Sequence, residues 1–122
     1  MWSEIPYNAR DVIIKGISDY KMIEHFTPEE SSSMFKNNLK FIENSISPSC
    51  RNIVLTHHSP IFEYHDVFSH AFCSRCDRVL KKVDVWLFGH THKNVIVGNA
   101  MSNCMGYRYN KTTGFYMKFL EL

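Results

Sequence analysis

The sequence lacks a long apolar run and shows no excess of charge of one sign. No apolar stretch approaches the roughly 18 residues of a membrane-spanning helix, so we expect no membrane association. Its 14 basic and 12 acidic residues leave a net charge of +2 without a Lys/Arg cluster, which argues against a nucleic-acid partner. The first residues lack the charged and apolar regions of a signal peptide, so the expected location is cytoplasmic.

Cysteine is too sparse for a disulfide framework. The four cysteines are Cys50, Cys73, Cys76 and Cys104, and in a reducing compartment free thiols are expected. Cys73 and Cys76 have the spacing of half a zinc site, but a second CxxC pair is absent. Residues 71–80 around them have a helical apolar pattern with Cys76 on the inner face. We therefore expect buried or half-buried free thiols rather than metal ligands.

The chain has enough apolar residues, 44%, to bury the core of one domain. A helix is expected from Thr27 to about Ser45, because Thr27 can cap it, Pro28 suits its first position and Glu30 completes a capping box. Its apolar residues recur at steps of three and four and form one stripe, made of Phe35, Leu39, Ile42 and Ile46.

Two short apolar runs predict strands covered on both faces, as in a parallel or mixed sheet with flanking helices. They span residues 52–56 and 83–88, and a helix over residues 70–82 is expected between them. Residues 11–17 fit a short helix or a strand equally well. Further strands are expected at 94–97 and 115–120, with turns over 98–114. The order predicts a layered α/β domain with a mixed sheet.

Both predicted strands end in histidine pairs. His57 and His58 follow the first strand, and His90 and His92 follow the second after Gly89, which we expect to let the backbone turn. In α/β sheets, ligands bind beyond the carboxyl ends of the strands. Neutral imidazole is a common ligand for Zn, Fe and Mn ions, so the pattern predicts a metal site.

These residues resemble a known family. Gly89-His90-Thr91-His92 is similar to the GHxH motif of calcineurin-like metallophosphoesterases, and the strand, histidines and proline of residues 54–60 resemble their preceding histidine motif. The resemblance implies part of an α/β/β/α sandwich. It also implies a phosphate mono- or diester substrate and two divalent metal ions (Mn, Fe or Zn) that activate a bridging hydroxide.

Carried over by position, His90 would bind one metal and His92 the other. Alignment by strand length makes His57 the further ligand, whereas alignment on the proline makes it His58. We favour His57, with His58 as the alternative ligand or a residue behind the ligands. Three other histidines are expected to be structural, although one of them, His65, could approach the site from its loop; they are His25, His65 and His70.

Three acidic motifs of the family are missing from the sequence: DxH, GDxxD, and GNH followed by Asp or Glu. Histidines without a bridging carboxylate should hold a divalent pair poorly. We therefore expect residues 1–122 to be a partial domain, the C-terminal half only, inactive or incomplete alone and without an assigned catalytic residue. Its uncovered sheet would favour a homodimer. The alternative is a non-catalytic, degenerate module that binds a metal or a partner.

Overall fold

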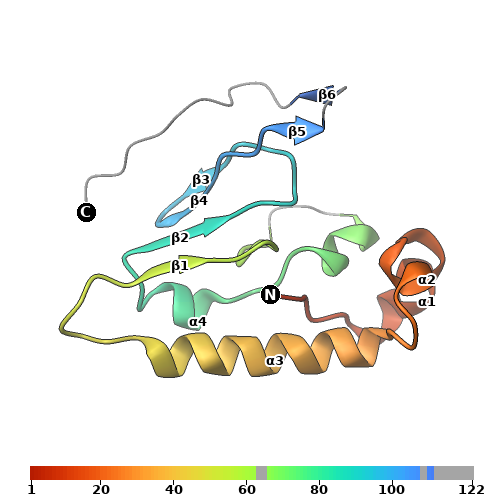
Figure 1. Cartoon of the computed structure of the whole chain (residues 1–122), viewed down its shortest axis with the longest axis horizontal. Coiled ribbons are helices and arrows are strands. Elements are labelled where there is room, and N and C mark those ends of the chain that lie inside the picture. Colours follow the sequence, from red (N-terminus) through yellow and green to blue (C-terminus); the bar gives the residue numbers. More distant parts are fainter. Residues whose placement is uncertain (63–65, 108–109, 112–122) are drawn as a thin grey trace.

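The computed structural model describes residues 1–62, 66–107 and 110–111, and it packs helices against a mixed sheet (Figure 1). The helical elements are η1 (Tyr7–Ala9), α1 (Arg10–Gly16), α2 (Asp19–Met22), α3 (Pro28–Ser45), η2 (Val67–Ala71) and α4 (Asp77–Leu80). The strands are β1 (Ile53–Leu55), β2 (Val85–Phe88), β3 (Ile96–Val97), β4 (Ala100–Ser102), β5 (Gly106–Tyr107) and β6 (Asn110–Lys111). The layered α/β class predicted from the sequence is confirmed.

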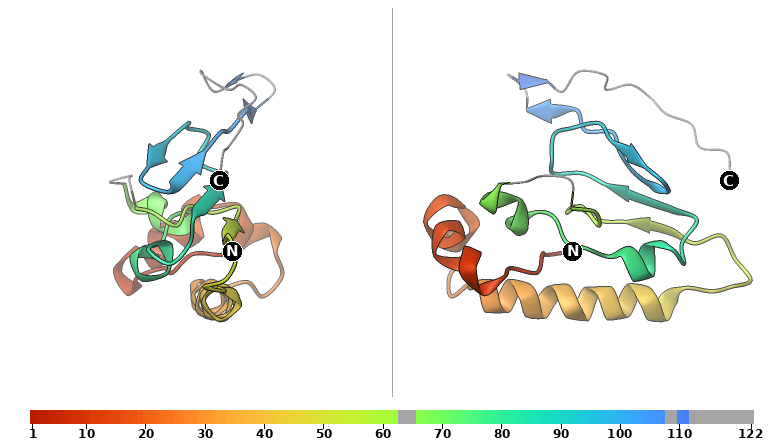
Figure 2. Two further views of the ribbon diagram at one scale, coloured as in Figure 1. Left: turned by 90° about the vertical axis from the view of Figure 1, so that its left-hand side faces the viewer. Right: turned by 180° about the vertical axis from the view of Figure 1, so that it is seen from behind.

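The main sheet has the strand order β1-β2-β4-β3. β1 and β4 each pair with β2 in parallel, whereas β3 pairs with β4 antiparallel, so the sheet is mixed as predicted. β5 and β6 form a separate antiparallel ribbon. The strands follow one another away from α3, with β1 nearest to it and β3 and β4 farther away (Figure 2).

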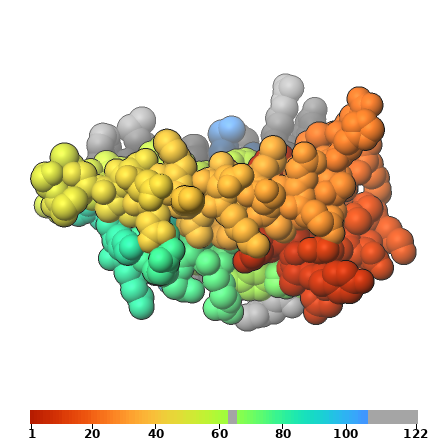
Figure 3. All heavy atoms as spheres, turned by 90° about the horizontal axis from the view of Figure 1, so that it is seen from below, coloured from red at the N-terminus to blue at the C-terminus, as the bar shows by residue number. Residues whose placement is uncertain are grey.

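Helix α3 begins and ends where the sequence predicts. Thr27 Oγ1 accepts a hydrogen bond from the Glu30 amide at 3.1 Å, which satisfies one of the amides that a helix start leaves open. The predicted stripe packs against a core that includes Val79 and the fully buried Trp86. Figure 3 shows α3 running across one face of the molecule, with the N-terminal residues beside its first half.

The expectation that both strands are covered on both faces is correct for β2 and wrong for β1. Three of the four β2 residues are buried, but Ile53 and Leu55 of β1 are 46% and 73% exposed. Successive strand residues point to opposite faces, so Val54 faces the core and its neighbours face outward. β1 is also an edge strand, because it pairs with β2 alone among the described residues.

The predicted helix over residues 70–82 is wrong in its middle. Only η2 and α4 are helical, and the chain between them is extended enough for Cys73 to bridge with Ser59. The backbone amides there donate to the loop after β1: Ser74 N to Ser59 O at 3.1 Å, and Cys76 N to Pro60 O at 3.0 Å. These long-range bonds replace the bonds of a continuous helix.

The turns predicted over residues 98–114 are also wrong in part, because β4, β5 and β6 lie there. β4 is hard to recognise because it is short and ends in a polar residue, Ser102. This side chain is buried but satisfied, since its Oγ donates to Lys93 O at 2.7 Å and accepts from Val95 N at 3.1 Å. Of the other segments, 11–17 is mostly helix α1, and 115–120 lies outside the described residues.

The N-terminal segment is threaded in extended form between α3 and the loops that carry the histidines. Ser3 and Ile5 are buried. Ser3 O accepts from Ser31 Oγ at 2.9 Å, and the Ile5 amide donates to Ser32 Oγ at 3.0 Å, so two serines of α3 hold the segment in place. This threading brings Trp2 and Ser3 to the site described next.

Candidate functional site

The histidines lie at the carboxyl ends of the parallel strands β1 and β2. Hydrogen bonds continue the pairing beyond the strands: Thr56 N donates to Leu87 O and Gly89 N donates to His57 O, both at 3.0 Å. The two strand ends are therefore held in register up to His57. This is the edge of the sheet at which α/β proteins place their ligand sites.

His57 and His90 meet through their ring nitrogens. His90 Nδ1 lies 2.9 Å from His57 Nε2, and the ring planes are nearly perpendicular at 88°. If the two rings form a hydrogen bond, one of these nitrogens carries the proton and donates, and the other accepts. Two imidazoles bound to one tetrahedral zinc ion would have nitrogens about 3.3 Å apart. The pair is thus spaced as a hydrogen bond, and a small widening would let both nitrogens reach one ion.

His58 lies behind this pair and is only 5% exposed. Its Nδ1 is 3.0 Å from Ser3 Oγ, and Trp2 contacts its ring edge-on. Burial, with smaller effects from His90 and His57, lowers the pKa of His58 to about 3, so the ring is neutral at pH 7. Of the two alternatives in the first motif, His57 is the residue whose nitrogen meets His90.

The turn after β2 is made by histidines in left-handed conformation. His90 has φ 63° and His92 has φ 52°, whereas Gly89 has no positive φ. The expectation that Gly89 lets the backbone turn is therefore wrong. A Cβ at Gly89 would lie at ordinary contact distance, 3.7 Å, from His57 Nδ1. Left-handed non-glycine residues cost on the order of 1 kcal/mol each, and such strain concentrates at functional sites.

His90 is enclosed by aromatic neighbours. The ring of Phe72 lies 4.4 Å from the ring of His90, centre to centre. Burial lowers the pKa of His90, and the nearby His57 and His92 lower it further. His90 is thus held in the neutral form, whose lone pair can bind a metal.

Four residues that surround the histidines were not predicted from the sequence to lie at the site. Trp2, Ser3 and Phe72 are far from the histidine motifs in the sequence, and only the fold brings them to the site. Thr56 is adjacent to a motif, and its Oγ1 donates to His58 O at 2.7 Å while accepting from the Trp86 indole N–H at 2.9 Å. A threonine at the end of a predicted strand, directly before the histidines, was the one local signal for such a role.

The remaining histidines and the cysteines are not brought into the pair. His70 packs against Phe62, and burial lowers its pKa, while His25 is exposed. His65 lies outside the described residues. Cys73 and Cys76 are buried thiols, as expected, and burial raises the pKa of the Cys76 thiol to about 12.

The fit to a divalent metal is partial. His57 and His90 each bring one ring nitrogen to the same point, 2.9 Å apart, and burial favours the neutral form of His90. However, no group of three or more His, Cys, Asp or Glu side chains that could hold an ion occurs in the part of the chain that the structure describes. The described residues bring together two side chains of the right chemistry but not a complete site.

The sequence comparisons agree with this fold and these motifs. The calcineurin-like phosphoesterase family model matches residues 3–94, more than half of the chain, and the chain therefore belongs to this family. It is thus a phosphoesterase-type protein, of a family that generally uses divalent metals. No curated protein and no solved structure gives a significant match. Within the described ranges, no helix is long and apolar enough to cross a membrane.

Proposed function

We propose that this chain is the histidine-bearing, C-terminal part of a metal-dependent phosphoesterase that hydrolyses phosphate mono- or diesters. The family match supports the reaction class. The observation that carries the proposal is the 2.9 Å approach of His90 Nδ1 to His57 Nε2 at the ends of two parallel strands. Two imidazole nitrogens this close need only a small widening to bind one metal ion.

In the complete site we assign His57 and His90 to one divalent ion and His92 to a second. Mn, Fe and Zn all suit such ligands. When bound, two such ions polarise a phosphoryl oxygen and supply hydroxide at neutral pH. The chain's own residues hold the ligands: the His58–Ser3 hydrogen bond stabilises the loop that carries His57, and Phe72 restricts the ring of His90.

We further propose that carboxylate ligands come from a second segment, so that residues 1–122 form a partial domain, incomplete on its own. The sequence contains none of the three acidic motifs named above. The free edge of β1 lies next to His57, and a strand added there in parallel would end beside that histidine. Such a strand is a suitable source of carboxylates.

The test is a phosphatase assay with Mn²⁺ on a monoester and a diester substrate. The 122-residue chain alone should give no turnover above background. A polypeptide that joins it to a segment with the three acidic motifs should give metal-dependent hydrolysis, lost in His90→Ala but retained in the exposed-histidine control His25→Ala. Absence of activity in the joined polypeptide, when it is folded and metal-loaded, would contradict the proposal.

A non-catalytic partner-binding module is the second candidate, and one surface favours it. A groove of about 500 Å³ lies between β1 and the second half of α3. Its walls include Phe41 and Leu55, which are 72% and 73% exposed. An apolar groove beside a free strand edge suits a second copy of the chain, which would pair at that edge.

Sedimentation measurements separate this candidate from the first. Self-association through the groove should be weakened by Leu55→Lys and unaffected by Lys81→Ala, a change on an exposed residue outside it. A stable dimer without turnover, even after the acidic segment is supplied, would support the module. A monomer at all concentrations would exclude this homodimer.

A further inference from the structure

A second cavity lies apart from the histidine pair. It has a volume of about 500 Å³ and opens between the N-terminal segment, the first half of α3 and the loop before α4. This size is within the range of small-molecule sites. The first half of α3 and the N-terminal residues that border the cavity lie side by side in Figure 3.

The lining of this cavity is cationic. Arg10, Lys36 and Arg75 are among the lining residues, whereas the carboxylates that line it are limited, in the described ranges, to Glu4. Glu4 pairs with Lys36 at 3.7 Å. Arg75 has no salt bridge with any described carboxylate, so its charge is available to an anion.

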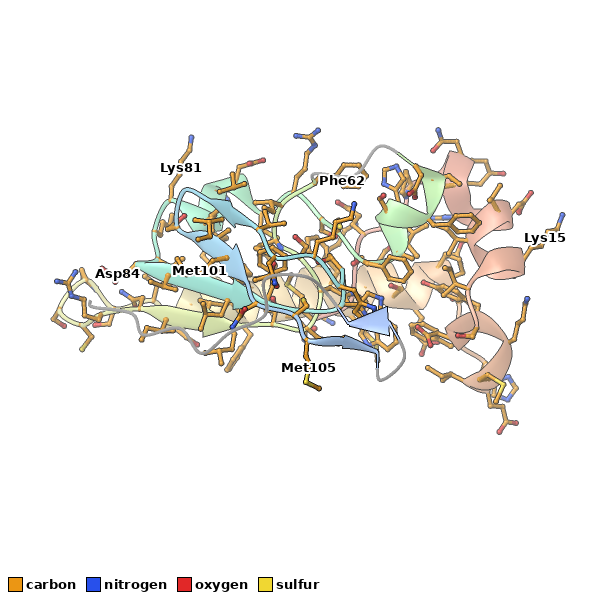
Figure 4. The ribbon with its side chains drawn as sticks, turned by 90° about the horizontal axis from the view of Figure 1, so that it is seen from above. Lys15, Phe62, Lys81, Asp84, Met101 and Met105 are labelled. Atoms are coloured by element: carbon orange, nitrogen blue, oxygen red, sulfur yellow. The ribbon has the colours of Figure 1, made fainter. Side chains whose placement is uncertain are left out.

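Each guanidinium of the cavity lies over an aromatic ring. Arg10 is 5.3 Å from the ring centre of Tyr7, and Arg75 is 5.8 Å from that of Phe62. Tyr7 is 84% exposed, and Phe62 lies at the rim of the molecule (Figure 4). Planar rings with adjacent guanidinium groups can stack a flat ligand and bind its anionic group at the same time.

The floor of the cavity is fixed by hydrogen bonds. The Glu4 amide donates to Ser74 Oγ at 2.9 Å, and the Ile5 amide donates to Ser32 Oγ at 3.0 Å. Both serines are buried. Arg10 pairs with Glu29 through Nη1, but its buried Nε has no hydrogen-bond partner among the described groups. A preformed floor lowers the entropic cost of binding a ligand.

We propose that this cavity binds an aromatic molecule that carries a phosphate group, of the nucleoside monophosphate class. Arg75 is the cation that suits phosphate, because it pairs with no described carboxylate and a guanidinium binds phosphate oxygens through charge-assisted hydrogen bonds, whereas Arg10 and Lys36 pair with Glu29 and Glu4. Tyr7 and Phe62 offer the stacking surfaces for the ring. The proposal does not depend on the function proposed above.

The cavity and the histidine pair are bordered by different residues of the same two chain segments, and neither His57 nor His90 lines the cavity. Ser3 and Phe72 contact His58 and His90, whereas their chain neighbours Glu4 and Cys73 line the cavity. A ligand in the cavity is therefore behind the histidines and does not occupy the position of a substrate at them. This makes it a separate binding site.

The experiment is calorimetric titration of the 122-residue chain with AMP in EDTA, which removes metal from the histidines. We expect saturable binding of one AMP per chain, with adenosine and inorganic phosphate each at least tenfold weaker. Arg75→Ala should weaken AMP binding at least tenfold. The matched control Arg51→Ala removes another exposed arginine, far from the cavity, and should change nothing.

A His57→Ala variant distinguishes the two sites, and it should bind AMP as the unchanged chain does. Circular dichroism should show that Arg75→Ala is folded, because this side chain is exposed. The proposal is overturned by no saturable AMP binding, by equal affinity in Arg75→Ala, by adenosine binding as well as AMP, or by loss of binding in His57→Ala alone. Failure here would leave the phosphatase assay above unaffected.

Discussion

At the scale of single residues, His58 is buried and neutral beside two other histidines. Its pKa is lowered to about 3, mainly by burial, whereas an unfolded chain would titrate it near its ordinary value of 6.5. Below pH 6.5 the unfolded state therefore binds a proton that the folded state does not. Stability contributed by neutral His58 is present above pH 6.5 and is lost as the pH falls toward 3.

We predict that the free energy of unfolding in EDTA falls by about 2 kcal/mol between pH 7.5 and pH 5 from His58 alone. His90 should add to the loss, since its pKa is also lowered. The measurement is urea unfolding at both pH values. In His58→Gln, which does not titrate, the difference should shrink by about that amount; an unchanged difference would show that His58 does not control it.

Two glycines, one beside the site and one in the turn before β4, allow a matched comparison of backbone strain. Gly98 has φ 58° with open space around its Cβ position, whereas Gly89 has no positive φ and room for a Cβ. Gly98→Ala should therefore lower the free energy of unfolding by roughly 1 kcal/mol, and Gly89→Ala should not lower it. Thermal or urea unfolding checks both; a larger loss in Gly89→Ala would mean that the turn after β2 does require glycine.

At the scale of elements, the segment between η2 and α4 buries two thiols without forming a helix. Cys73 and Cys76 are 1% and 2% exposed, whereas Cys50 is exposed. Burial also raises the pKa of Cys76, and the reactive form of cysteine is the thiolate. Both properties should protect these two thiols from alkylation.

Iodoacetamide followed by peptide mass spectrometry tests this protection. We expect rapid modification of Cys50 in the native chain and modification of Cys73 and Cys76 only on addition of denaturant. Rapid native modification of Cys76 would mean that the segment opens readily. Zn²⁺ should not alter the result, because the two thiols are not assigned as ligands.

Local signals were sufficient for some elements and insufficient for others. α3 was predictable because its cap, its proline and its apolar stripe agree in one continuous segment. The helix over 70–82 failed because its amides bond to Ser59 and Pro60, partners that no local pattern reveals. β4 was missed because its polar Ser102 is satisfied by Lys93 and Val95 within the fold.

The candidate site shows the same division. The positions of the histidines at the strand ends followed from the apolar runs and from the rule for parallel strands. The sequence favoured His57 over His58 as a ligand, but it did not reveal the surroundings of His58, because only the fold brings Ser3 and Trp2 to that ring. The left-handed backbone of His90 and His92 was also not predicted, because the neighbouring Gly89 was expected to make the turn.

At the scale of the whole molecule, the chain belongs to the calcineurin-like phosphoesterases, and β1 forms an edge of its sheet that no other described strand pairs with. A further strand would pair with the backbone groups of this edge and extend the apolar face that Ile53 and Leu55 expose. The proposed acidic segment and the proposed homodimer compete for this edge. Supplying the segment should therefore abolish self-association.

The central claim is that His57 and His90 bind the same metal ion. Calorimetric titration with Zn²⁺ of the unchanged chain, His57→Ala, His90→Ala and the double variant tests it most directly. Each single change should weaken binding at least tenfold, the double change should add little more, and His25→Ala should have no effect. Additive losses, or unchanged affinity in either single variant, would contradict a shared ion and with it the assignment of this site.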